Sequence, residues 1–174
     1  FVIVQNKNKV CKNEKEKNSI ILNIKIMAQT KIEQESYILF HLAGTSYGIN
    51  SQSVKQLEIV EGVTPVPNTP GYVDGVVFTR GQVIPVINLR KRFGFEAAEY
   101  NIKTRMIVVT GEGRTVGVIV DSAREFIKIP AASIQPPPEN IVGLSGKYLN
   151  GITNLEGRIV LILNIEALLM IENN

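Results

Sequence analysis

The sequence predicts an all-β fold: two five-stranded, SH3-like β-barrels packed side by side, with a short C-terminal helix. Three observations lead to this prediction. Apolar residues make up 44% of the 174 residues, enough to build a core. Most apolar runs are short and end at Gly, Pro or Asn, as β-strands do. A pattern of strand, glycine turn, strand and asparagine also occurs twice, and a repeat of this kind indicates two similar units.

The repeated pattern spans Tyr72–Leu89 and Tyr148–Ile165. Its offset is constant without a gap, since 148 − 72, 151 − 75, 157 − 81 and 164 − 88 all give 76. The turn of the first copy carries Arg80, whereas the turn of the second carries Glu156. Folding alone does not require opposite charges at these two positions. Arg80 is therefore the first candidate for a functional residue.

Residues 1–35 are expected to be an N-terminal extension, either disordered or added upstream of the folded protein. Residues 1–26 are rich in Asn and Lys and lack regular apolar periodicity over most of their length, and Met27-Ala28-Gln29-Thr30 resembles an ordinary protein start. The alternative is a genuine basic arm that binds an acidic partner.

The first barrel subdomain is expected at residues 36–94. Tyr37–Leu42 and Ser46–Ile49 form a hairpin around Ala43-Gly44-Thr45, and Val54–Val60 is a third strand. Residues 64–71 hold three prolines, which lack the ladder donor of a central strand, so this segment is a connector. The first copy of the repeat follows, and Leu89–Phe93 is a helical turn that stops at Gly94.

The second subdomain is expected at residues 95–174. Residues 105–110 and 115–120 form a hairpin, residues 123–129 are a third strand, and the second repeat copy leads into a helix over 166–171 with Leu168 and Leu169 inward. The loop over 131–147 is seven residues longer than its counterpart, because the repeat offset grows from 69 to 76. Long loops in compact domains are often functional. A strand exchanged between the subdomains would move their boundary.

Each unit has about 60–67 residues, a size at which one core alone gives marginal stability, so we expect the two to share a hydrophobic seam. Grooves at such seams bind ligands and partner helices. Arg80 then has two interpretations. It is a solvated turn residue, or its guanidinium projects into the groove and binds a carboxylate or helix carbonyls.

The charge pattern does not indicate nucleic-acid binding. The formal charge is +3, but the residues before Met27 carry six Lys and two Glu, or +4, and the rest carry 13 basic and 14 acidic residues, or −1. The folded part is therefore nearly neutral.

No enzyme signature is present. Cys11 and His41 are the only residues of their types, which excludes an intrachain disulfide and multi-histidine metal sites, and no cofactor or metal is expected. Gly111–Arg114 lacks the Gly-Lys-Ser/Thr of a phosphate loop and is interpreted as a hairpin turn. No apolar run approaches 18 residues, so we expect a cytoplasmic protein.

Several segments together resemble the CheW family of bacterial chemotaxis coupling proteins. These are Tyr-Gly-Ile at residue 47, Thr-Pro-Val-Pro-Asn-Thr-Pro at 64, Arg-Gly-x-x-Ile-Pro-Val-Ile-Asn-Leu-Arg at 80, and Val-Gly-x-Ile-Val-Asp at 116. The resemblance runs from about Ser36 to Leu169. It implies two five-stranded barrels and a non-enzymatic adaptor. Its partners would be the cytoplasmic tips of methyl-accepting chemoreceptors, which recruit it to membrane arrays, and the regulatory domain of the histidine kinase CheA.

The resemblance also implies two sets of contact residues. The receptor-binding set is Ile49, Val54, Gln56, Leu57, Arg80 and Gly117. The kinase-binding set, mapped more loosely, is Pro67, Tyr72, Gly75, Leu89, Phe93, Gln135, Ile141 and Val142. Two features depart from the family pattern: Phe78-Thr79 replaces the usual Asn-Leu before Arg-Gly, and Gln56 stands where a relative carries Glu.

Three alternatives stay open. The same domain could belong to a larger chemotaxis protein, either the kinase's regulatory domain or a coupler with a receiver domain. A nucleic-acid-binding double β-barrel is a second class, and a hydrolase is the third.

Overall fold

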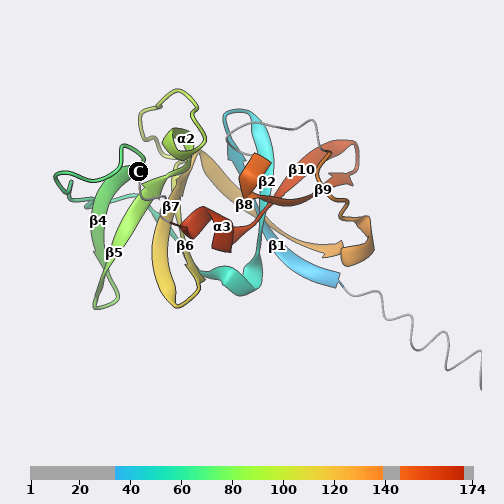
Figure 1. Ribbon diagram of the computed structural model, residues 1–174, viewed down its shortest axis with the longest axis horizontal. Helices are drawn as coiled ribbons and strands as arrows, with labels where there is room; N and C mark the ends of the chain where they lie inside the picture. The colour runs from blue at the N-terminus through green and yellow to red at the C-terminus, as the bar shows by residue number, and fades with distance from the viewer. Residues whose placement is uncertain (1–33, 139–145, 171–174) are drawn as a thin grey trace, which may run out of the picture. The chain divides into compact units, whose positions relative to one another are not determined.

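The computed structural model describes residues 34–138 and 146–170, which form ten strands in two five-stranded sheets (Figure 1). Sheet A has the order β8 (Ser122–Pro130), β1 (Gln34–Leu42), β2 (Thr45–Asn50), β10 (Arg158–Leu163) and β9 (Leu149–Leu155). Sheet B has the order β3 (Val54–Ile59), β6 (Arg105–Gly111), β7 (Arg114–Val120), β5 (Gln82–Asn88) and β4 (Val73–Thr79). The helical segments are α2 (Leu89–Arg92), α3 (Ile165–Leu169), η1 (Ser51–Ser53), η2 (Ala131–Ser133) and η3 (Gly146–Tyr148).

The predicted all-β fold, with two five-stranded units and a short C-terminal helix, is confirmed. Leu168 and Leu169 of α3 are buried, as expected. The predicted extension over residues 1–35 lies almost wholly outside the described residues.

The two sheets do not follow the expected subdomains at residues 36–94 and 95–174. The hairpin β1–β2 belongs to sheet A with β8, β9 and β10, whereas the hairpin β6–β7 belongs to sheet B with β3, β4 and β5. Each sheet thus combines a hairpin from one half of the chain with three strands from the other. Within the sheets, all strand pairs are antiparallel except β5 with β7 and β10 with β2.

Short connectors explain this exchange. Asp121 is the only residue between β7 and β8. A tight hairpin needs a loop of two residues, so β8 cannot fold back on β7 and continues into the other sheet. Asp121 also holds the crossover in place. Its Oδ2 accepts a hydrogen bond from the Ala43 backbone N–H at 2.8 Å, and its carboxylate pairs with Arg90 at 2.6 and 2.7 Å. One side chain therefore links the β1–β2 turn to α2.

The two copies of the sequence repeat have the same local geometry. Asn88 and Asn164 cap α2 and α3, and their side chains accept hydrogen bonds from the backbone N–H three residues later. Arg80 and Glu156 both have positive φ, 47° and 51°, and both are followed by a positive-φ Gly. This pair of left-handed residues fits a type I′ hairpin turn.

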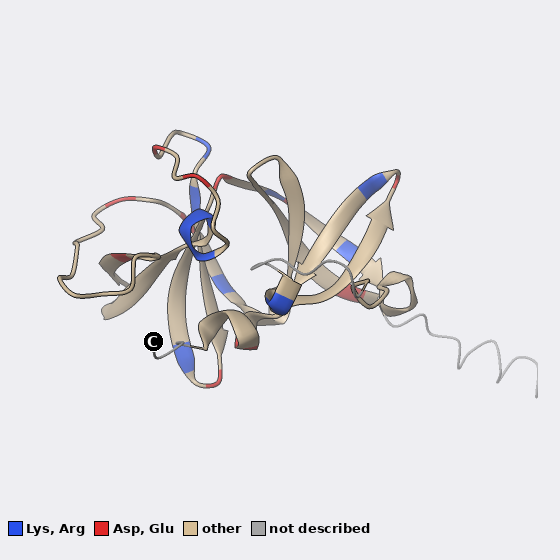
Figure 2. Ribbon diagram, turned by 45° about the horizontal axis from the view of Figure 1, so that its top comes forward, with Lys and Arg blue, Asp and Glu red and all other residues tan. Residues whose placement is uncertain are grey.

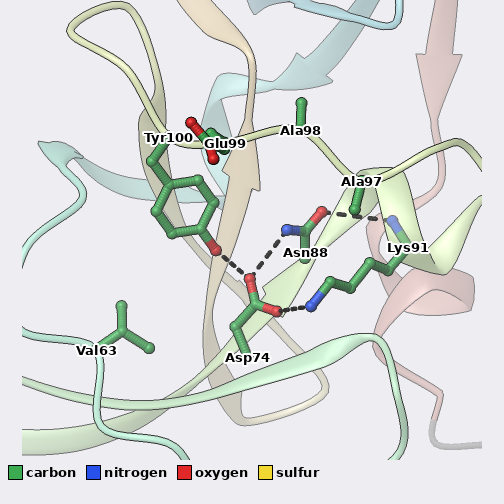
Figure 3. A pocket seen from close by; sticks show the side chains of 8 residues that line it. All are labelled: Val63, Asp74, Asn88, Lys91, Ala97, Ala98, Glu99 and Tyr100. Carbon is green, nitrogen blue, oxygen red and sulfur yellow. Dashed lines mark hydrogen bonds and ion pairs between the residues drawn. The ribbon is translucent and has the colours of Figure 1, made fainter.

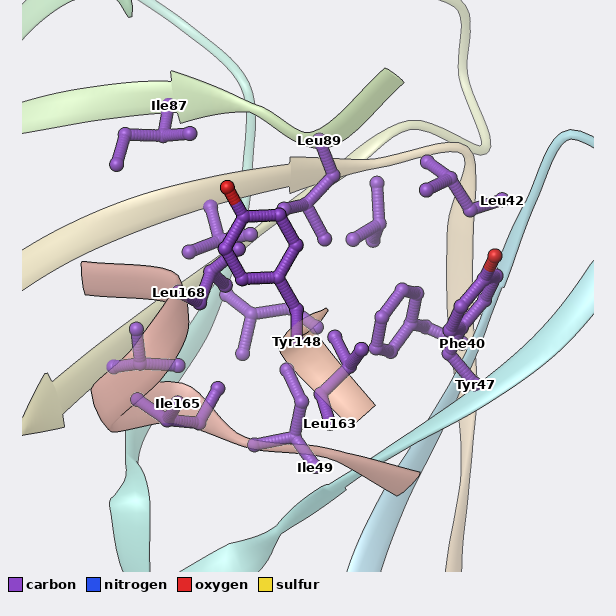
Figure 4. Packing of buried hydrophobic residues seen from close by; sticks show 14 of the residues in the cluster. Phe40, Leu42, Tyr47, Ile49, Ile87, Leu89, Tyr148, Leu163, Ile165 and Leu168 are labelled. Carbon is purple, nitrogen blue, oxygen red and sulfur yellow. The ribbon is translucent and has the colours of Figure 1, made fainter. Parts of the chain in front are cut away.

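The main hydrophobic core is shared by the two sheets (Figure 4). Phe40, Tyr47 and Ile49 of sheet A pack in one cluster with Ile107 and Val118 of sheet B. Each sheet also has a smaller cluster of its own: Met106 and Val108 lie in that of sheet B, whereas Leu39 and Ile162 lie in that of sheet A. The shared cluster joins the sheets into one folding unit.

The edge strands of both sheets are bridged at equivalent places. Thr64 pairs with Val76 of β4, and Gln135 pairs with Ile152 of β9. Each pair is held by two backbone hydrogen bonds of 2.8–2.9 Å. The connectors after β3 and after β8 are thereby fastened to the opposite edge of their own sheet.

Replacing Gly75 with Ala should destabilise the fold by about 2 kcal/mol or more. Gly75 has φ 145°, and an added Cβ would overlap the Thr64 carbonyl oxygen in the bridge to β4. The measurement is the free energy of unfolding from urea denaturation. Gly71→Ala is the matched control, because a Cβ there meets open space, and it should stay within about 0.5 kcal/mol of the parent. Equal stability of the two variants would contradict the close approach.

Replacing Asp121 with Asn should lower the free energy of unfolding and make it depend less on pH in the acid range. Burial alone raises the pKa of the Asp121 carboxyl, but donation from Arg90 and from the Ala43 N–H outweighs it, so the pKa is lowered. Its stabilisation is therefore present above the unfolded pKa of about 3.9 and is lost as the pH falls through the lower folded pKa.

We expect Asp121→Asn to cost about 1–3 kcal/mol at pH 7 and less at pH 3, measured by urea denaturation across this range. Glu112→Gln, in the exposed β6–β7 turn, is the control. An Asp121→Asn cost that is the same at both pH values would refute the proposed role of the carboxylate.

Candidate partner-binding surfaces

The exposed part of the receptor-binding set lies on sheet B, on β3 and the β4–β5 turn. Leu57 is 43% exposed on β3, and Arg80 is exposed in the turn. Gln56 is partly buried, and Val54 is partly buried against the shared core. A hydrogen bond of 3.2 Å from Gln56 Nε2 to Thr79 Oγ1 links the two elements.

This link joins β3 to β4 at residues that adjoin the two exposed candidates in sequence. Leu57 follows Gln56 in sequence, and Arg80 follows Thr79. Thr79 Oγ1 also donates to Glu58 Oε1 at 3.1 Å, which adds a second connection between β3 and β4. Gln56 and Glu58 therefore share one face of β3, and Leu57, between them in sequence, lies on the opposite, exposed face.

Arg80 is exposed, as in the first of its two interpretations, and the second, a guanidinium that projects into a groove, stays a prediction. Arg80 occupies the tip of the β4–β5 hairpin and lines neither of the two cavities described below. Among the described residues, it has no hydrogen-bond or ion-pair partner. The type I′ turn carries residue 80 beyond the end of the sheet, so its guanidinium is open to a partner.

Two members of the receptor-binding set are buried and offer no surface for direct contact. Ile49 is fully buried in the shared core. Gly117 lies inside sheet B, where an added Cβ would come within 2.6 Å of Met106 Sδ. Their role is in the packing of the fold beneath the surface. The sequence could not reveal this, because their burial depends on which strands pair.

The kinase-binding set is similarly divided. Pro67 and Gln135 are exposed on the connectors that bridge the sheet edges, and Tyr72 is partly buried. Gly75, Leu89 and Phe93 are buried, so their contribution is to the fold. Ile141 and Val142 lie outside the described residues.

The sequence analysis missed an apolar pair beside Arg80. Phe78 and Val83 are directly opposite each other on β4 and β5, and they are 72% and 64% exposed. The signal was available: both residues occupy outward-facing positions of alternating strands, and Phe78 departs from the family pattern. The turn that carries Arg80 therefore has an apolar flank.

A cavity of about 540 Å³ contains a polar network centred on Asp74 (Figure 3). Its carboxylate accepts hydrogen bonds from Asn88 Nδ2 at 2.9 Å, from Lys91 Nζ at 2.6 Å and from the Tyr100 hydroxyl. The network ties the segment between α2 and β6 to β4 and β5.

The Asp74 carboxylate has three hydrogen-bond donors within this network, which does not resemble an active site. Burial alone raises the pKa of Asp74, but the donors Lys91, Tyr100 and Asn88 outweigh it and lower the pKa. Burial and the neighbouring Asp74 raise the pKa of Tyr100, so the phenol stays protonated. Neither group is thus a free base near neutral pH, which favours a structural role.

The described residues give little support to other classes of site. They contain no cluster of three or more His, Cys, Asp or Glu placed to hold a metal ion. Charges of both signs are distributed over the two sheets (Figure 2), which does not favour a nucleic-acid interface. In the described part of the chain, no helix is long and apolar enough to cross a membrane.

Comparisons with known proteins agree with the fold. The chemotaxis protein CheW of Klebsiella aerogenes is 33% identical over 138 residues, covering 79% of this chain and 83% of that protein. CheW of Helicobacter pylori is 37% identical over 135 residues, covering 76% and 80%. The crystal structure of the scaffolding protein TtCheW from Thermoanaerobacter tengcongensis matches with a TM-score of 0.75 and 30% identity, covering 81% of this chain and 96% of that chain.

A family model described as a CheW-like domain matches residues 36–172, which contain both sheets. This match shows directly what the motifs around Tyr47, Arg80 and Gly117 predicted. The chain belongs to the CheW-like family.

Proposed function

We propose that this protein is a non-enzymatic chemotaxis adaptor that couples the tips of methyl-accepting receptors to the regulatory domain of the kinase CheA. The observation that carries the proposal is the CheW-like match over residues 36–172, which spans both sheets. The TtCheW structure with the same fold is described as that of a scaffolding protein. The protein would act in the cytoplasm and reach the membrane through the receptors.

The receptor would bind at the junction of β3 and the β4–β5 hairpin. A receptor tip is a helical hairpin, so the binding mode is a helix laid against an apolar surface. Leu57 offers the apolar contact, and the unpaired Arg80 supplies directional hydrogen bonds that fix the register. Phe78 and Val83 extend the apolar area beside Arg80.

The kinase would bind at the two bridged edges. Pro67 lies on the connector fastened to β4, and Gln135 lies on the connector fastened to β9. These connectors occupy equivalent places in the two sheets. Two similar but separate surfaces would allow one adaptor to contact two kinase copies and to extend an array.

Replacing Arg80 with Ala should weaken receptor binding about tenfold or more, because charge-assisted hydrogen bonds are lost. CheA binding and the melting temperature should stay nearly unchanged, since Arg80 is exposed and has no partner among the described residues. The measurement is a pull-down followed by titration, with a receptor-tip fragment and the CheA regulatory domain offered separately and together.

The chain offers two matched controls for this variant. Glu156→Ala changes the equivalent turn of the other repeat copy, and Arg124→Ala removes an exposed arginine of β8. Both should leave receptor binding within about twofold of the parent, because surface changes away from a contact cost little. Loss of receptor and kinase binding together in Arg80→Ala would refute the division of surfaces.

Replacing Pro67 with Glu should weaken CheA binding and spare receptor binding. Pro67 is exposed on the connector, so the charge would disturb a docked partner and leave the core intact. We expect a loss of about tenfold, measured by titration with the CheA regulatory domain. Loss of receptor binding alone would contradict the assignment of Pro67 to the kinase surface.

A further inference from the structure

A second cavity, of about 490 Å³, lies where β5 and β7 meet the C-terminal end of α3. Its wall is mostly apolar and includes Ile87, Val116 and Leu168. Two cations, Arg92 and Arg114, also line it, and no Asp or Glu does. Among its described lining residues, the cavity therefore combines an apolar interior with two positive charges and no negative one.

Arg92 is the unusual member of this wall, because it is only 5% exposed. Its Cζ lies 4.0 Å from the centroid of the Tyr72 ring and 5.2 Å from that of the Tyr148 ring. Nη2 donates to the Met170 carbonyl oxygen at 2.9 Å. Nε is buried without any hydrogen-bond partner, and Arg92 forms no ion pair with the described residues.

A buried cation in this position lacks its usual counter-ion. Buried charges are normally paired, because leaving water costs a guanidinium more than cation–π contacts return. The contrast with Arg90 is direct, since that residue is paired with Asp121 at 2.6 Å. Arg92 has no anionic partner in residues 34–138 and 146–170, and a carboxylate is the anion that matches a guanidinium best.

We propose that this cavity binds an amphiphilic monocarboxylic acid, an alkyl or aryl chain that ends in a carboxylate. The apolar chain would lie along Ile87, Val116 and Leu168, and the carboxylate would reach Arg92 at the wall. The volume falls within the range of ordinary small-molecule sites. A peptide backbone fits less well, because most of the wall cannot satisfy its N–H and C=O groups.

The inference does not rest on the proposed adaptor function. The cavity is separate from Leu57 and Arg80, and neither residue lines it. Arg114, an exposed residue at the start of β7, adds a second positive charge to the wall. Both arginines would favour an anion over a neutral ligand of equal size.

The test uses the full chain and 4-phenylbutyrate as the probe, with 4-phenylbutan-1-ol as the neutral match. Binding is followed by backbone amide shifts in NMR titrations. We expect saturable shifts confined to β5, β7 and α3, with the acid bound at least tenfold more tightly than the alcohol. No binding of the acid at 10 mM, equal affinity for the two probes, or shifts elsewhere would overturn the proposal.

Variants distinguish the contribution of the Arg92 charge to binding from that of the cavity volume. Arg92→Gln should lower the affinity for phenylbutyrate at least tenfold and leave that for the alcohol nearly unchanged. Val73→Trp fills the cavity from β4 and keeps Arg92, so it should lower the affinity for both probes. It tests the site even if Arg92→Gln does not fold. Arg124→Gln, an exposed arginine of β8, should change neither affinity.

A further titration with a peptide tests whether the carboxylate comes from a small acid or from a protein partner. N-acetyl-Leu-Glu-Leu-amide carries a side-chain carboxylate between apolar residues. We expect it to bind more weakly than phenylbutyrate. Tighter binding of the peptide, lost in Arg92→Gln, would assign the cavity to a protein partner and overturn the small-acid proposal.

Discussion

The structure depends on the core that the two sheets share. Because the hairpin β1–β2 joins strands from the second half of the chain and β6–β7 joins strands from the first, neither half can complete a sheet alone. The crossover at Asp121 fastens this exchange by bonding to Ala43 on one side and Arg90 on the other. Two units that would be marginal separately thus fold as one body.

The exchange also explains how one scaffold presents different surfaces. The two sheets repeat the same hairpin, the same asparagine cap and the same bridged edge, so their frameworks are equivalent. The exposed positions on that framework are not equivalent, since Arg80 stands where the other copy has Glu156. Different partners can therefore be recognised by side chains at matching places on a duplicated backbone.

Two arginines of the same short helix have different environments, one partly exposed and one buried. Arg90 is paired with Asp121, which stabilises the junction of the sheets. Arg92, two residues later on the same short helix, lies against Tyr72 and Tyr148 with one carbonyl partner and an unpaired Nε. The first arrangement is complete, whereas in the described part of the chain the second has no anionic partner.

The sequence by itself determined the strands, the turns, the repeat and the family, because these follow from local patterns: alternating apolar residues, glycines at left-handed positions and an asparagine before each helical turn. The family resemblance also named Leu57 and Arg80 as candidate contact residues, and both are exposed. Only the tertiary structure decided which hairpin joins which sheet, because the two hairpins are alike in sequence pattern. That choice sets burial, so Ile49, Gly117, Leu89 and Phe93 lie inside the fold. It also places Arg92 between two tyrosine rings, without a counter-ion among the described residues.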